Sequence, residues 1–114
     1  MTSVKIPLVF FSTEAGNEPV RDWLKELPEA DRRAVGQDLM RAQWRWPIGM
    51  PLCRNLGNSL WEIRSSLPRG RIARVIFCTR DGALVALHGF IKKTQKTPQS
   101  DLDLAAKRQK ELDT

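Results

Sequence analysis

Two turn signals in the second half of the chain limit its possible folds more than any other feature. Pro68-Arg69-Gly70 and Arg80-Asp81-Gly82 separate three apolar runs, at residues 60–67, 71–79 and 84–91. Each run has the length of a β-strand, and the runs are rich in β-branched and aromatic residues. We therefore expect three consecutive antiparallel strands that are joined by tight turns.

The segment before these strands has a helical pattern. Apolar residues follow the helix-start signal Asn17-Glu18-Pro19 at the spacing i, i+3, i+4, i+7, and these are Val20, Trp23, Leu24 and Leu27. Pro28 should end this first helix. A second helix is expected from about Glu29 to Trp44, so that the two form a helical hairpin.

The remaining segments complete the expected order. Lys5 to Phe11 predicts a short first strand, and residues 45–59, with two prolines and two glycines, indicate a loop. Ser100 and Asp103 resemble a capping box for a last helix over about Asp101 to Leu112. The order β-α-α-β-β-β-α predicts an α+β fold with a mainly antiparallel sheet, the helical hairpin on one face, and a C-terminal helix. A length of 114 residues suits one domain over residues 1–114.

The turn lengths determine which side chains face each other across the strands. With residues 68–70 as the loop, Arg64 lies opposite Arg74. With residues 80–82 as a three-residue loop, Arg74 lies opposite His88. A two-residue Asp81-Gly82 turn is the alternative, and it would move His88 to the core side.

The three-residue loop is favoured because it produces one uniformly apolar sheet face for the helical hairpin. That face consists of Trp61, Ile63, Ala73, Val75, Phe77, Val85, Leu87 and Ile91. The opposite face then carries Arg64, Arg74 and His88, beside Glu62, Ser66 and Phe90.

The positive charge of the chain is concentrated in this region. The formal net charge is +6, and residues 50–96 hold nine basic and two acidic residues, whereas the remaining ten basic and eleven acidic residues nearly cancel. A positive field on one part of a small protein indicates an anionic partner, most often nucleic acid. A solvated basic surface that binds nothing is the alternative.

The predicted polar face has the residue types needed to cleave a phosphodiester without a metal. Two arginines that face each other repel, so either Glu62 or a bound anion such as phosphate must offset Arg64 and Arg74. The ribose 2′-OH can attack the adjacent phosphate if a base such as His88 removes its proton and cations stabilise the transition state. Because deoxyribose lacks this hydroxyl, the residues favour RNA over DNA as the substrate.

Several classes of protein are disfavoured by composition. The chain has two cysteines, Cys53 and Cys78, without the spacing of a metal site or a disulfide framework, and one histidine. We therefore expect free thiols, no metal and no cofactor. No apolar run approaches the ~20 residues that cross a membrane, so a cytoplasmic protein is expected.

The residues also resemble a known family. The element order, the phrase Leu60-Trp61-Glu62-Ile63-Arg64, the strand with Arg74 and the run from Leu87 to Pro98 are similar to RelE/HigB-type toxins, and most similar to their phage-derived HigB-like branch. The resemblance covers nearly the whole chain. It implies the toxin of a type II toxin–antitoxin pair, which cleaves mRNA on translating ribosomes and stops translation. The implied partners are mRNA, the ribosome and a cognate antitoxin, which is typically a small helix-turn-helix protein. Operator DNA is expected to be contacted only through the antitoxin.

The resemblance also assigns site residues. Arg64 matches the family's sheet arginine, Lys92 or Lys93 the basic residue after the last strand, and Arg54 loosely the basic residue before the second strand. Several members use a C-terminal tyrosine, but this chain has none, and His88 is the natural substitute. The expected catalytic set is Arg64, Arg74, His88, Lys92 and Lys93, and the expected RNA-binding set is Arg54, Arg45, Lys96 and Arg71.

Two other functions remain open. One is a ParE-like toxin of the same fold, which poisons DNA gyrase without nuclease activity. The other is a non-enzymatic phage protein that binds nucleic acid. The clustered arginines, lysines and histidine favour the nuclease over both.

Overall fold

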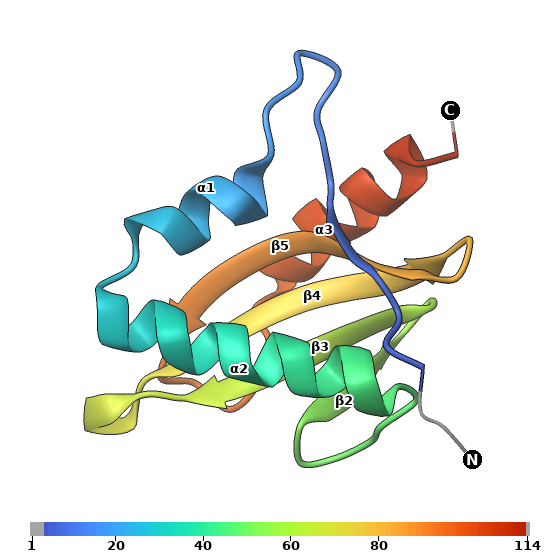
Figure 1. The fold of residues 1–114 in the computed structure, drawn as a ribbon. Coiled ribbons are helices and arrows are strands. Elements are labelled where there is room, and N and C mark those ends of the chain that lie inside the picture. The colour runs from blue at the N-terminus through green and yellow to red at the C-terminus, as the bar shows by residue number, and fades with distance from the viewer. Residues whose placement is uncertain (1–3, 114) are drawn as a thin grey trace.

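A mixed five-stranded sheet with helices on both faces forms the centre of the molecule (Figure 1), in a computed structural model that describes residues 4–113. The elements are β1 (Leu8–Phe10), α1 (Pro19–Glu26), α2 (Glu29–Arg45), β2 (Cys53–Gly57), β3 (Leu60–Ser66), β4 (Ile72–Arg80), β5 (Ala83–Lys92) and α3 (Gln99–Glu111). The strand order is β1-β5-β4-β3-β2, and only β1 pairs in parallel, with β5. The expected α+β class is confirmed.

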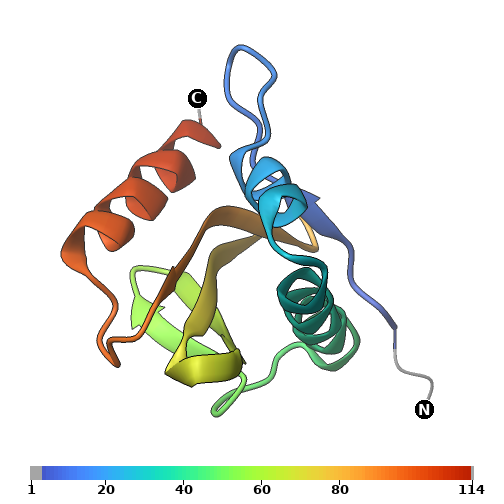
Figure 2. The ribbon, with the colours of Figure 1, turned by 90° about the vertical axis from the view of Figure 1, so that its left-hand side faces the viewer.

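The sheet separates two apolar cores. Figure 2 shows α1 and α2 on one side of the sheet and α3 on the other. The hairpin side buries residues from α1, α2 and the strands, among them Val20, Val35, Leu39, Ile63, Val75 and Phe77. The smaller core under α3 contains Phe11, Leu60, Ile76, Leu87, Phe90 and Ala105. Within residues 4–113, no helix combines the length and the apolar character that a membrane crossing requires.

The expected loop over residues 45–59 is wrong in part, because it contains strand β2. The strand pairs antiparallel with β3, and the two-residue turn Asn58-Ser59 joins them. Both turn residues have positive φ, 53° and 64°, as a type I′ hairpin turn requires. The first strand is also shorter than expected, since β1 covers only Leu8–Phe10 of the run Lys5 to Phe11.

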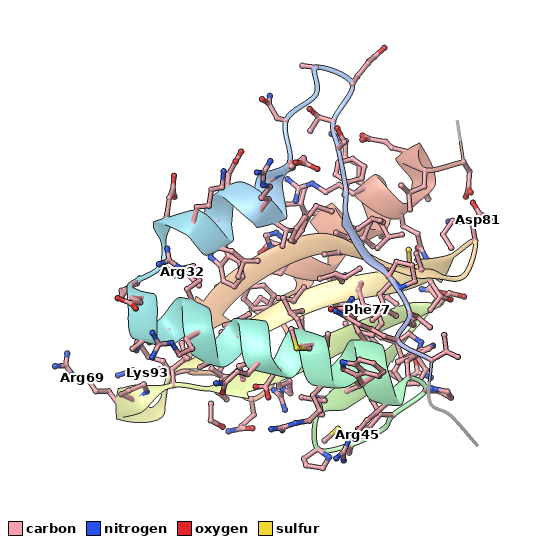
Figure 3. All side chains as sticks on the ribbon, in the orientation of Figure 1. Arg32, Arg45, Arg69, Phe77, Asp81 and Lys93 are labelled. Carbon is pink, nitrogen blue, oxygen red and sulfur yellow. The ribbon has the colours of Figure 1, made fainter. Side chains whose placement is uncertain are left out.

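The turn between β4 and β5 is the two-residue alternative and not the favoured three-residue loop. Arg80 pairs with Ala83 across Asp81 and Gly82, whose φ values are 52° and 76°. Asp and Gly tolerate these left-handed conformations, so the hairpin closes with a two-residue turn. Figure 3 labels Asp81 at this turn.

A β-bulge at Leu87 then changes the register along β5. Ala86 pairs with Phe77, but His88 pairs with Ile76, so Leu87 is the extra residue. Its carbonyl accepts a 2.8 Å hydrogen bond from Arg108 of α3. The bulge returns His88 to the face that carries Arg74.

The expected partner of Arg74 and part of the expected apolar face therefore need correction. Arg74 lies opposite Phe90 and not opposite His88. Val85 and Leu87 pack in the core under α3, and Leu84 and Ala86 take their place on the hairpin side. The prediction that Arg64 lies opposite Arg74 is confirmed.

The last helix begins two residues earlier than expected and without the predicted capping box. Pro98 is its N-cap residue, and no side chain caps the helix. The carboxylate of Asp103 instead accepts a 2.8 Å hydrogen bond from the side chain of Gln99.

Gly89 allows α1 to approach the sheet. A Cβ at this position would lie 2.4 Å from Cε3 of the Trp23 ring on α1, closer than any normal contact. Because this side of the glycine is occupied by an indole, any larger residue would push α1 away from β5.

We predict that Gly89→Ala destabilises the protein by about 1–3 kcal/mol, because the added methyl group collides with Trp23. Urea unfolding measures this change in the free energy of unfolding. Gly36→Ala in α2 is the matched control: its added methyl group would meet no side chain within 4 Å, so it should stabilise by about 0.5–1 kcal/mol. Equal stability of Gly89→Ala and the wild type would contradict the close contact.

Candidate active site

The connection between β5 and α3, residues 93–98, crosses over the two sheet arginines, and we call this segment the strap. Arg64 donates from Nη2 to the carbonyl of Gln95. Arg74 donates from Nη2 to the carbonyl of Thr94 and from Nη1 to that of Lys96, the latter at 3.3 Å. The two guanidinium groups that face each other on β3 and β4 are thus held by neutral backbone acceptors.

Glu62 supplies the negative charge between these arginines. Its side chain is fully buried, and its Oε1 lies 3.1 Å from Nε of Arg64. Its Oε2 accepts a 2.6 Å hydrogen bond from the hydroxyl of Thr97 in the strap. The carboxylate therefore offsets the charge of the arginines, as one of the two alternatives from the sequence expects. The carboxylate also ties the strap to β3.

Arg74 is as fully buried as Glu62. Its side chain has no exposed surface, and its Cζ lies 5.8 Å from the centre of the Phe90 ring. Burial lowers the pKa of Arg74, and the positive charge of Arg64 lowers it further, although Glu62 acts in the opposite direction. Its buried Nε has no hydrogen-bond partner among the described residues, so the guanidinium has donor capacity to spare.

The predicted catalytic residues His88 and Lys92 both contact Asp101 at the start of α3. Nε2 of His88 lies 2.7 Å from Oδ1 of Asp101, and Nζ of Lys92 lies 2.9 Å from Oδ2. The imidazole stacks on Phe90 with ring centres 5.3 Å apart, and Nζ of Lys92 lies 5.7 Å from the same ring. Phe90 therefore stands between Arg74, His88 and Lys92.

Burial and the neighbouring cations shift the pKa of the Asp101 carboxyl in opposite directions. Burial alone raises the pKa of this carboxyl, but the hydrogen bonds and positive charges of His88 and Lys92 outweigh burial and lower it below its ordinary value of 3.8. Asp101 is therefore ionised at neutral pH and fastens α3 to β5.

The predicted RNA-binding residues do not form one cluster. Arg71 makes two hydrogen bonds to Asp31 of α2, at 3.0 and 3.2 Å. Arg54 lies on β2 directly opposite Glu62, and Lys96 is exposed in the strap. Arg45 ends α2.

The predicted residue Lys93 is exposed at the beginning of the strap. Figure 3 labels Lys93 and Arg69 close together at the left of the view, whereas Arg45 is labelled where α2 ends.

Arg64 is the site residue that reaches a cleft. A cleft of about 550 Å³ lies between α2, the segment before β2, the ends of β3 and β4, and the strap. Its lining is Asp38, Arg41, Met50, Pro51, Leu52, Arg64, Ser66, Ile72 and Gln95. Neither Arg74 nor His88 is part of this lining, since Arg74 donates to carbonyls of the strap and His88 contacts Asp101 of α3. The cleft offers an anion two guanidinium groups, those of Arg41 and Arg64.

Sequence reasoning missed Asp101, Thr97 and Arg41 as members of the site. Strand β2 was not expected, and the start of α3 was placed two residues too late. The path of the strap over the sheet was therefore not predicted. A signal for Asp101 was available, because it lies eight positions after Lys93, in the first turn of the expected helix, where acidic residues are favoured.

We predict that Asp101→Asn destabilises the protein by about 1–3 kcal/mol at neutral pH, because it leaves His88 and Lys92 without their carboxylate. The lowered pKa means that the ionised carboxyl stabilises the fold above the unfolded-state pKa. This stabilisation is lost as the pH falls through the folded-state pKa. The difference between variant and wild type should therefore shrink in acid, as measured by urea unfolding from about pH 7 to about pH 3.

The matched control for this experiment is Asp103→Asn, which changes an exposed carboxylate of the same helix. It should change stability by less than about 0.5 kcal/mol. An Asp101→Asn penalty that stays constant down to acid pH would exclude the ion pairs as its cause.

A family of known proteins matches most of this chain. A family model described as "Phage derived protein Gp49-like (DUF891)" matches residues 22–110, which include α2, the four strands β2 to β5 and nearly all of α3. A search of curated proteins finds no match. The matched region contains both arginines, the strap and Asp101. The chain thus belongs to the phage-derived Gp49-like family, a toxin-like family related to RelE and HigB in toxin–antitoxin systems.

Proposed function

We propose that this protein is the toxin of a type II toxin–antitoxin pair, and that it cleaves mRNA on the ribosome and thereby stops translation. The family supports the toxin class. The observation that carries the nuclease assignment is Arg64, whose guanidinium lines a 550 Å³ cleft beside Arg41. Two guanidinium groups at one cleft suit the phosphates of a nucleic acid chain.

The proposed reaction is attack of a ribose 2′-OH on the adjacent phosphate, with loss of the 5′-oxygen of the next nucleotide. Negative charge grows on the phosphate oxygens in the transition state, and Arg64 stabilises it. Lys92, the last residue of β5, or Lys93 next to it adds a second cation. The leaving 5′-oxygen takes up a proton, so the products are a 2′,3′-cyclic phosphate and a 5′-hydroxyl.

Binding of RNA would displace the strap from the arginines. The guanidinium groups of Arg64 and Arg74 now donate to neutral carbonyls of the strap. A phosphate is a stronger acceptor than a carbonyl because the hydrogen bond is then assisted by charge on both sides. Exchange of carbonyls for a phosphate would open the face that carries Arg74 and His88, and would assemble the site only when substrate is present.

His88 is the proposed base. It is the only histidine, and the chain has no tyrosine. In the neutral ring, a hydrogen bond from Nε2 to Asp101 leaves Nδ1 free to accept a proton. A carboxylate that orients an imidazole in this way is a common arrangement in acid–base catalysis. Asp101 is then a positioning residue.

We predict that Arg64→Ala lowers the rate of mRNA cleavage by about 10²–10³, since removal of one group that stabilises the transition state has this effect. Cleavage is measured by primer extension on mRNA in a purified translation system. Arg33→Ala is the control, because Arg33 is an exposed arginine of α2 that pairs with Glu29.

Arg64→Lys separates catalysis from folding, because it keeps a positive charge near the buried Glu62. It should unfold close to the wild-type temperature and still cleave at least tenfold more slowly, as the planar guanidinium is lost. Full activity of both Arg64 variants would refute the proposed site. DNA damage without inhibited translation would indicate a gyrase poison instead.

We predict that His88→Gln slows cleavage by about 10²–10⁴, the range for loss of a general base, with little change in binding to the ribosome. The glutamine amide keeps a hydrogen bond to Asp101, so the attachment of α3 is retained. Single-turnover cleavage and ribosome pelleting measure the two quantities. An unchanged cleavage rate would assign His88 to the attachment of α3 alone.

A further inference from the structure

Helix α3 contacts His88 and the residue before it through two charged side chains. Asp101 in the first turn of α3 contacts Nε2 of His88 at 2.7 Å. Arg108 donates a 2.8 Å hydrogen bond from Nη1 to the carbonyl of Leu87, the residue that precedes His88. Arg108 lies seven positions after Asp101, about two helical turns away, so both side chains project from one face of α3. The first contact belongs to the proposed catalytic site, and the second has no role there.

The carbonyl that Arg108 reaches belongs to the β-bulge. Within residues 4–113, Leu87 pairs with no residue of β4 or β1. A bulged residue is left out of the ladder and the strand bends there, so no cross-strand partner fixes the orientation of this peptide group. The carbonyl of Leu87 and the N and Cα atoms of His88 lie in one planar peptide unit. A hydrogen bond to this carbonyl therefore fixes the plane from which the His88 side chain starts.

The bulge determines which way the imidazole points. Without it, the register that pairs Phe77 with Ala86 would continue, and His88 would lie opposite Val75, whose side chain is in the hairpin-side core. Gly89 takes that position instead, beneath the ring of Trp23. The extra residue in β5 is therefore the reason that His88 faces α3.

An arginine is a costly residue at the position of Arg108. Its side chain is partly buried, and its Cζ lies 5.7 Å from the centre of the Phe11 ring. Burial lowers the pKa of Arg108, although Glu111 acts in the opposite direction, and this lowering reflects the cost of keeping the charge there. An aliphatic side chain would cover Phe11 without that cost. What the guanidinium adds is the hydrogen bond to the bulge.

We propose that Arg108 is a positioning residue for His88: its hydrogen bond to the Leu87 carbonyl orients the bulged backbone, and Asp101 orients the imidazole at the other end of the same residue. This inference rests on the proposed function for the role of His88 as base, but the position of the ring is measured without a cleavage assay. Loss of the hydrogen bond would misplace the base and leave Arg64 at the cleft. It would therefore slow the chemical step without weakening the binding of substrate.

The first test is kinetic. Arg108→Met keeps an unbranched apolar stem over Phe11 but has no donor, and Arg108→Gln, a shorter polar side chain that leaves the carbonyl without its donor, replaces it if the methionine variant does not fold. Single-turnover cleavage of mRNA on ribosomes should slow by roughly tenfold to 10²-fold, the effect of a misplaced catalytic group. The protein concentration that gives half of the maximal rate should not change.

Two further variants serve as controls for the kinetic test. Arg108→Lys keeps a cationic donor and should recover most of the lost rate. Lys107→Met removes the same charge from the neighbouring, exposed position of α3 and should cleave at the wild-type rate. Circular dichroism confirms that each variant is folded at the temperature of the assay.

The second test observes the ring directly by NMR. His88 is the only histidine, so its two imidazole nitrogens give one pair of ¹⁵N signals. In the wild type, the neutral ring should be the Nε2–H tautomer and show a nuclear Overhauser effect to Phe90, on which it stacks. Arg108→Met should show a mixture of tautomers and a weaker effect to Phe90, and Lys107→Met should match the wild type.

Three results would overturn the inference. They are unchanged imidazole signals in folded Arg108→Met, an equal change in Lys107→Met, and slower cleavage that arises only from weaker binding to the ribosome. A wild type that cleaves no RNA, together with a displaced ring in Arg108→Met, would refute the proposed function and leave the positioning role of Arg108 standing.

Discussion

The buried carboxylate of Glu62 is the group on which the rest of the site depends. It is buried from solvent next to Arg64, and it accepts a hydrogen bond from the hydroxyl of Thr97. A buried charge without a partner costs several kcal/mol, so Glu62, the arginines and the strap must come together in one arrangement. This requirement explains why two arginines lie face to face on neighbouring strands and why the chain returns over them before α3 begins.

The same arrangement links the structure to the proposed chemistry. Neutral carbonyls hold the guanidinium groups in place without neutralising them, so the site retains an excess of positive charge. The ionised carboxylate of Asp101 holds His88 and Lys92, and it also fixes the start of α3. A phosphodiester that replaces the strap carbonyls would meet arginines already oriented toward it, which reduces the reorganisation needed in the transition state.

The sequence was sufficient to predict the class of fold and the pairing of Arg64 with Arg74, because the turn at residues 68–70 leaves little choice of register. It was not sufficient for the partner of Arg74. Two features of β5 act together there: the Asp81-Gly82 turn shifts the strand by one residue, and the bulge at Leu87 shifts it again. His88 therefore lies on the expected face for a reason that a pattern of alternating residues cannot supply.

The position of the strap over the arginines could not be predicted from the sequence either. Residues 93–98 have the composition of a solvated loop, and nothing local indicates that their carbonyls face two arginines. Strand β2, in contrast, was missed although the turn signal Asn58-Ser59 between Gly57 and Leu60 is local.

The central claim is that the cleft at Arg64 cleaves RNA through the ribose 2′-OH. The most direct measurement uses an mRNA with a single 2′-deoxynucleotide at a mapped cleavage position, translated in a purified system with the wild-type protein. Cleavage at that position should disappear, whereas unmodified positions should still be cut and leave 2′,3′-cyclic phosphate ends. Undiminished cleavage at the deoxynucleotide would contradict the claim.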